Sequence, residues 1–176
     1  MKTYLFICLF LFASFSNSFC RINGNDSLII IMKESELLNQ KLLDCVKNEP
    51  QNLKLQSRLR REFEQYYEEH FLLKHKLFII NTICNLKDKE FIQEYFNFCY
   101  QLSNCADETL GEILFEIYQC QPDFFLEEIV KLKRDEFNVI LKKSQDAFIM
   151  NTQGTENQIK DYTLLKSRLF KLIPDR

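Results

Sequence analysis

The sequence has few residues that interrupt regular secondary structure. Its 176 residues include only three glycines, three prolines and no tryptophan. Because glycine and proline mark turns and end helices, their scarcity argues against long linkers and against the many tight turns of an all-β fold. The glycines at positions 24, 111 and 154 are isolated from one another, so the sequence has no glycine-rich phosphate-binding loop.

Histidine is also scarce, which limits the metal and catalytic chemistry of the chain. The only two, His70 and His75, would lie about 140° apart around a helix axis, so they cannot share one ligand face. The sequence contains no HExxH motif, no close pair of CxxC motifs and no G-x-S-x-G motif. We therefore expect no metal site, no cofactor and no enzymatic activity.

Neither sign of charge dominates the composition. The chain has 23 lysines and arginines against 25 aspartates and glutamates, a net charge of −2. Nucleic-acid-binding domains carry a marked excess of basic residues, so we expect no nucleic-acid partner. Beyond the N-terminal segment, no apolar run reaches the roughly 20 residues that a transmembrane helix needs, and none is expected in the mature chain.

The longest apolar run lies at the N-terminus. After one lysine, Tyr4 to Phe15 form an apolar run of about twelve residues, typical of a signal-peptide core and too short for a bilayer. Ser16-Asn17-Ser18 then supplies small residues at a cleavage site. We predict a signal peptide at 1–18 and a secreted or periplasmic mature chain, with an uncleaved membrane anchor as the alternative. A lipid anchor at Cys20 is not expected, because the preceding residue, Phe19, is large.

Of the seven cysteines, six remain after this cleavage and would meet an oxidising compartment. Cys99 and Cys105 flank a predicted turn and could form a disulfide across it. Cys105 and Cys120 would lie about 22 Å apart on one helix, which excludes that pair. Cys45, Cys84 and Cys120 each end an apolar segment, and we expect them to pack rather than to bond.

Apolar residues recur at three- and four-residue steps along most of the mature chain, which predicts amphipathic helices. Residues 19–27 are expected to be a loose N-terminal segment, and 28–176 a single all-α domain. Asp88 is the expected N-cap of the helix that follows it. We predict helices over residues 28–47, from the turn at Pro50 to Cys84 with a break near 68–72, and over 89–102, 105–120, 123–132, 135–150 and 155–172.

Three of the predicted turns resemble one another: CVKNEPQN (45–52), CNLKDKEF (84–91) and CQPDFFLE (120–127). Their first cysteines are 39 and 36 residues apart, the length of a two-helix repeat. Between Leu77 and Cys99 the pattern resembles a HEAT-type helical hairpin, in which a short turn with an aspartate, here Asp88, joins two apolar helices. Glu94 departs from that family, which often places a basic residue there.

The resemblance implies antiparallel helical hairpins stacked in a short HEAT-like right-handed array. An irregular helical bundle, which would produce much of the same apolar spacing, is the alternative.

A basic surface is predicted on the second helix. Lys54, Arg58 and Arg61 follow i, i+4, i+7 spacing, with Arg60 beside them, and could bind an anionic partner; a solvated face near Glu62 is the alternative. We therefore predict an exported non-enzymatic helical protein that binds an unknown protein or peptide. The alternative is a domain that binds a small apolar ligand in a pocket lined by some of its 17 phenylalanines and seven tyrosines.

Overall fold

The computed structural model describes residues 26–105, 108–151, 163–165, 167–168 and 171, and these contain helices and no strand. The predicted all-α class is thus confirmed. The signal peptide predicted at 1–18, Cys20 and most of the helix predicted at 155–172 lie outside the described residues. The helices are the N-terminal helix (residues 26–48), α2 (Leu53–Tyr67), α3 (Leu73–Leu86), α4 (Lys89–Gln101), α5 (Thr109–Cys120), α6 (Pro122–Ile129) and α7 (Arg134–Asn151), and the described residues 163–165, 167–168 and 171 are also helical.

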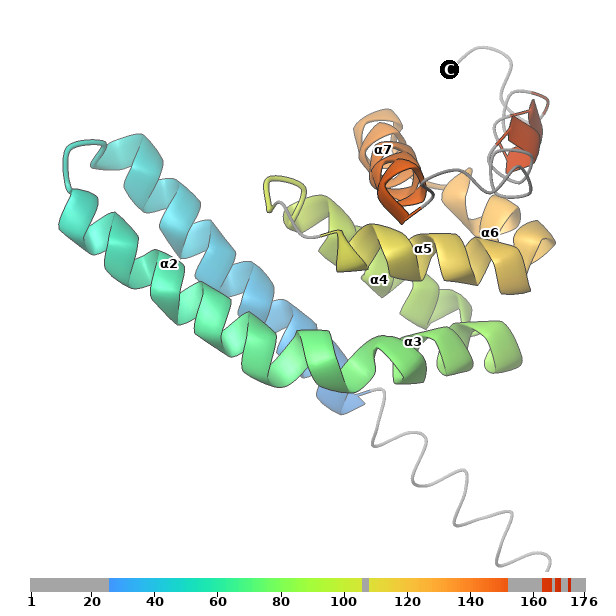
Figure 1. The fold of residues 1–176 in the computed structure, drawn as a ribbon, viewed down its shortest axis with the longest axis horizontal. Helices are drawn as coiled ribbons and strands as arrows, with labels where there is room; N and C mark the ends of the chain where they lie inside the picture. The colour runs from blue at the N-terminus through green and yellow to red at the C-terminus, as the bar shows by residue number, and fades with distance from the viewer. Residues whose placement is uncertain (1–25, 106–107, 152–162, 166, 169–170, 172–176) are drawn as a thin grey trace, which may run out of the picture.

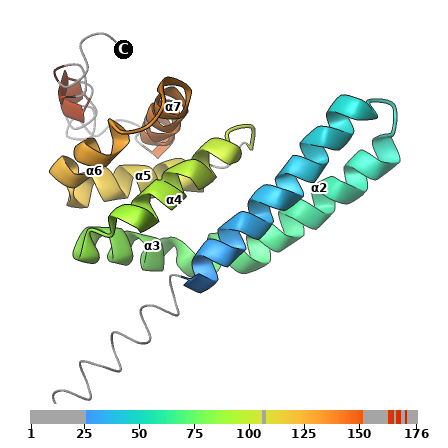
Figure 2. The same cartoon turned by 180° about the vertical axis from the view of Figure 1, so that it is seen from behind.

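The N-terminal helix and α2 form an antiparallel hairpin that projects from a body built of α3 to α7 (Figures 1 and 2). Asn52 caps α2, since its side-chain oxygen accepts a hydrogen bond from the amide of Leu55 at 3.2 Å. Within the hairpin, Leu42, Cys45 and Phe63 are buried. We call residues 26–67 the projecting hairpin.

The predicted break near residues 68–72 is confirmed. A π-helical turn occupies Glu68–Leu72 and joins α2 to α3 without an intervening loop. The wider turn shifts the apolar face, and the chain changes direction there (Figure 1). Tyr67 and Phe71 stay buried across the turn and stack at 5.3 Å, and Phe71 contacts Phe98 of α4 at 4.6 Å between ring centroids.

The α3–α4 and α5–α6 hairpins contact each other at a nearly constant offset in sequence. Residues 36 and 40 apart join α3 to α5, and residues 35 to 39 apart join α4 to α6. The two hairpins therefore lie side by side with equivalent helices adjacent. This arrangement does not by itself confirm the predicted HEAT-like array. The connecting pairs are Lys76–Glu112, Lys76–Glu116 and Cys84–Cys120 between α3 and α5, and Lys89–Glu127, Lys89–Glu128 and Gln93–Glu128 between α4 and α6.

The expectation that Cys84 and Cys120 pack without bonding is wrong, because the two form a disulfide with their Cα atoms 5.9 Å apart. Typical distances between helix axes are larger, about 8–10 Å, but side-by-side helix ends bring facing residues closer. The side-chain amide of Gln121 donates to the carbonyl of Cys84 at 2.8 Å and holds the same ends together. Cys99 and Cys105 are not joined to each other in the structure. The disulfide between them stays a prediction, which only a chemical assay tests.

The predicted cap at Asp88 is confirmed, since its carboxylate accepts from the amide of Phe91 at 3.0 Å. The start predicted for the next helix is wrong, because α5 begins at Thr109 and not at residue 105. Asn104, in the connection before α5, accepts a hydrogen bond from the side chain of Asn39 at 3.2 Å.

Asn39 joins the projecting hairpin to the body. Its side chain is buried, with 2% of its surface exposed, and its amide donates to the carbonyl of Gln101 at 3.1 Å as well as to Asn104. The thiol of Cys105 donates a hydrogen bond to the side-chain oxygen of Asn39 at 3.7 Å. Because buried polar groups need partners, these bonds fix the N-terminal helix against the end of α4.

We expect Asn39→Leu to lower the free energy of unfolding by about 2 kcal/mol, because it removes the two hydrogen bonds that the buried amide of Asn39 donates to Gln101 and Asn104. Chemical denaturation of the mature chain measures the change. The control is Gln40→Leu, at the exposed neighbour that donates a hydrogen bond to Asp44 on its own helix. Equal effects of the two substitutions would contradict the role of Asn39.

The double variant Cys84→Ser/Cys120→Ser should lose roughly 3–4 kcal/mol of stability, the loop-closure effect expected for a disulfide between residues 36 apart. A reductant should destabilise the wild type to the level of the variant and leave the variant unchanged. Cleavage at glutamate and lysine places Cys84 and Cys120 on two separate peptides and Cys99 and Cys105 together on a third. Peptide mapping therefore identifies which cysteines are bonded. A wild type insensitive to reductant would contradict the Cys84–Cys120 bond.

Candidate functional site

The basic residues predicted on the second helix are all exposed on α2. Lys54, Arg58 and Arg61 lie on one face and form what we call the basic stripe, whereas Arg60 lies about 120° away from Lys54 around the helix axis. Among the described residues, none of the four forms an ion pair within 4.0 Å. The structure therefore brings three of the four predicted residues together.

The position of the stripe strengthens its positive potential. The first turn of α2 has no acidic residue, so the partial positive charge of the helix N-terminus adds to the cations. The start of α2 lies at the end of the projecting hairpin that is farthest from the body (Figures 1 and 2). The stripe is consequently held out in solvent, where a partner can reach it.

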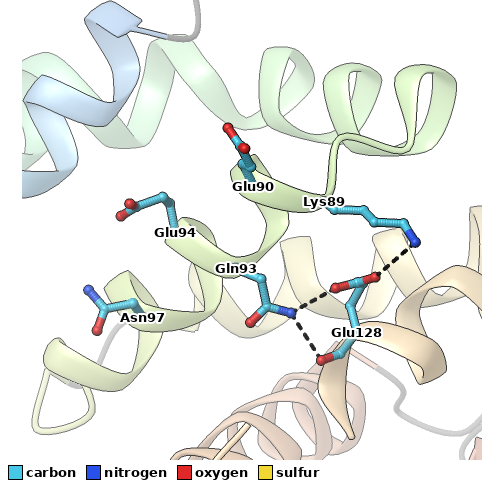
Figure 3. A pocket seen from close by; sticks show the side chains of 6 residues that line it. All are labelled: Lys89, Glu90, Gln93, Glu94, Asn97 and Glu128. Carbon is cyan, nitrogen blue, oxygen red and sulfur yellow. Dashed lines mark hydrogen bonds and ion pairs between the residues drawn. The ribbon is translucent and has the colours of Figure 1, made fainter. Parts of the chain in front are cut away.

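A second surface is an open groove of about 640 Å³ on α4 and α6, lined by residues with polar or charged side chains. The lining side chains on α4 recur at steps of three and four residues, so they share one helix face, while the opposite face of α4 buries Phe91, Tyr95 and Phe98. We call this surface the acidic groove (Figure 3). Its lining residues are Lys89, Glu90, Gln93, Glu94, Asn97 and Glu128.

Glu128 is the buried carboxylate of the groove, with 1% of its side chain exposed. The amide of Gln93 donates to its carboxylate at 2.9 Å and to its backbone carbonyl at 3.1 Å (Figure 3). The ammonium group of Lys131 lies 2.5 Å away and that of Lys89 lies 3.8 Å away. A buried carboxylate is tolerated only when it is paired in this way, so Glu128 binds α6 to α4.

Lys89 is already neutralised at the edge of the groove. Its ammonium group lies 2.9 Å from the carboxylate of Glu127. This hydrogen bond raises the pKa of Lys89 and lowers the pKa of Glu127. Glu90 and Glu94, in contrast, form no ion pair within 4.0 Å among the described residues. The net charge of the groove is therefore negative.

Glu36 of the N-terminal helix extends the negative charge beyond the groove. Its carboxylate accepts a hydrogen bond from the amide of Asn97 at 3.3 Å. Burial raises the pKa of Glu36, the charge of Glu94 raises it further, and Lys33 opposes the change. Glu36 and Glu94 thus repel each other, and a cation between them would relieve the repulsion.

Sequence reasoning found the basic stripe and missed the acidic groove. The i, i+4 spacing of Glu90 and Glu94 was visible, but it is common on solvated helix faces. The contribution of Glu128 depends on contacts between residues 35 apart, which local spacing does not reveal.

The described residues contain no group of three or more histidine, cysteine, aspartate or glutamate side chains placed to hold a metal ion. His70 instead packs against the ring of Tyr66, with ring centroids 4.6 Å apart. Within the same described ranges, none of the helices combines the length and the apolar character that a membrane crossing requires.

Comparison with protein-family models, with curated proteins and with solved structures finds no match to this chain. The two surfaces are therefore interpreted from their own geometry and charge.

We expect Glu128→Ala to lower the free energy of unfolding by about 2 kcal/mol, because it leaves a cavity and removes the acceptor of Gln93. The matched control is Glu127→Ala, the exposed neighbour whose ion pairs are screened by solvent and whose loss should change stability little. Thermal and chemical unfolding measure both. If Glu127→Ala destabilised the protein as much as Glu128→Ala, the binding of α6 to α4 would not depend on Glu128.

Proposed function

We propose that this chain is an exported, non-enzymatic helical protein that binds a protein or peptide partner through its projecting hairpin. The observation that carries the proposal is the basic stripe, three exposed cations that begin near the far end of the hairpin and form no ion pair with the part of the chain that the structure describes. Complementary charges steer association and select partners, so such a surface favours a partner with an acidic face.

The disulfide supports export. Disulfides persist in oxidising compartments and are rare in the cytosol, and Cys84 and Cys120 are bonded here. This agrees with the signal peptide predicted at 1–18 and with a secreted or periplasmic mature chain.

The finer architecture that we propose is a short HEAT-like stack made of the α3–α4 and α5–α6 hairpins. The narrow range of offsets between their contacts, 35 to 40 residues, supports it, because stacked repeats contact equivalent positions of their neighbours. In this proposal the projecting hairpin lies outside the stack.

The alternative, a domain that binds a small apolar ligand, receives less support. The described aromatic side chains pack against one another in the core: Phe125 meets Phe96 edge-on at 5.5 Å and Tyr118 at 5.8 Å between ring centroids. These rings fill space that a ligand would need, and the acidic groove is lined by polar side chains rather than aromatic ones.

Affinity capture tests the proposal. The mature chain 19–176 is immobilised and exposed to the secreted or periplasmic fraction of its source, beside the variant Lys54→Ala/Arg58→Ala/Arg61→Ala. We expect the wild type to recover a partner and the variant to recover at least tenfold less of it. The control Arg134→Ala/Lys142→Ala/Lys171→Ala removes three exposed cations outside the projecting hairpin and should behave as the wild type. Failure to recover any partner, or equal recovery by the stripe variant, would refute the proposal.

A further inference from the structure

We propose that the partner of the basic stripe is the acidic groove of a second copy of this chain. The inference rests on the proposed function, because it assigns a partner to the surface named there. Such a contact between two copies requires two complementary surfaces that lie too far apart to meet within one molecule. The basic stripe and the acidic groove are two such surfaces.

The spacing of the two surfaces matches. Lys54, Arg58 and Arg61 occupy positions i, i+4 and i+7 of α2, and the groove side of α4 has Glu90, Glu94 and Asn97 at the same steps. Each set spans about 10.5 Å along its helix. With the two helices parallel, Lys54 faces Glu90 and Arg58 faces Glu94.

The third position is also complementary. Arg61 would face Asn97, whose amide nitrogen already donates to Glu36 at 3.3 Å. The oxygen of Asn97 and the carboxylate of Glu36 can both accept from a guanidinium group, which has several donors in a fixed plane. The cation would also lie near Glu94 and relieve its repulsion with Glu36, the repulsion that helps to raise the pKa of Glu36.

The contact has to be made between molecules. The stripe begins at the far end of the projecting hairpin, whereas α4 lies in the body (Figures 1 and 2). Both surfaces have unpaired charges available: the three cations of the stripe, and Glu90 and Glu94, form no ion pair among the described residues. Figure 3 shows the side chains of Glu90 and Glu94 extending away from α4.

Every copy carries both surfaces, so the contact is of one kind whatever the size of the assembly. Two copies that dock reciprocally close a dimer, and copies that dock in sequence form a chain. Both assemblies depend on the same charges and should weaken as salt rises, because exposed ion pairs are screened at high ionic strength.

Charge exchange in the purified mature chain tests the contact, with sedimentation velocity as the measurement. We expect the wild type to associate at low ionic strength, with at least tenfold weaker association in about 1 M salt, where the Debye length is about 3 Å. The stripe variant Lys54→Glu/Arg58→Glu/Arg61→Glu and the groove variant Glu90→Lys/Glu94→Lys should each be monomeric. Mixed together they should associate. The acidic stripe of the first variant meets the basic groove of the second, and the unaltered basic stripe of the second meets the unaltered acidic groove of the first.

Two controls keep the test specific. Arg134→Glu/Lys142→Glu/Lys171→Glu changes the net charge as much as the stripe variant does and should still associate. Because Glu90 lies in the first turn of α4, where a lysine is unfavourable, Glu94→Lys alone serves as a second groove variant.

A monomeric wild type, association that survives either exchange, or a mixture that stays monomeric would overturn the inference. A monomeric wild type that still captures a different protein through its stripe would overturn the inference alone and leave the proposed function standing. Salt-sensitive self-association that the mixed variants restore would support it even if no other protein is captured.

Discussion

The contact between the α3–α4 and α5–α6 hairpins determines where every other surface of the described chain lies. It is fixed at one end by the disulfide between Cys84 and Cys120 and in the middle by the buried carboxylate of Glu128. Because the disulfide restricts the unfolded chain and the carboxylate is tolerated only with its partners, the two act on different sides of the folding equilibrium. Together they hold α6 beside α4 and so form the acidic groove.

The projecting hairpin depends on this body through two local features. The π-helical turn at Glu68–Leu72 redirects the chain from α2 into α3 without a loop, so no connection at that point can act as a flexible linker. Asn39 fixes the N-terminal helix to the end of α4 through buried hydrogen bonds. The result is a hairpin that projects from the body, with the basic stripe running from near its outer end to the middle of α2 and the acidic groove on the body.

Local signals in the sequence predicted much of the fold. The helical class, the cap at Asp88 and the break at 68–72 follow from spacing, turn residues and helix length, which depend on near neighbours. The bond between Cys84 and Cys120 was missed because spacing along the chain does not give the separation of facing residues on adjacent helices. The groove was missed for the same reason, since Gln93 and Glu128 meet only after the hairpins pack. The basic stripe was found because all of it lies on one helix.

The contact between stripe and groove is tested most directly by zero-length cross-linking of an equal mixture of unlabelled and ¹⁵N-labelled mature chain. A carbodiimide joins an amine to a carboxylate as an amide, with loss of water, only when the two groups touch. The proposed register predicts a cross-link between Lys54 and Glu90. In half of these products one peptide should be labelled and the other unlabelled, and the cross-link should disappear at high salt. A Lys54–Glu90 product made only within single copies, or no such product under conditions where the chain associates, would contradict it.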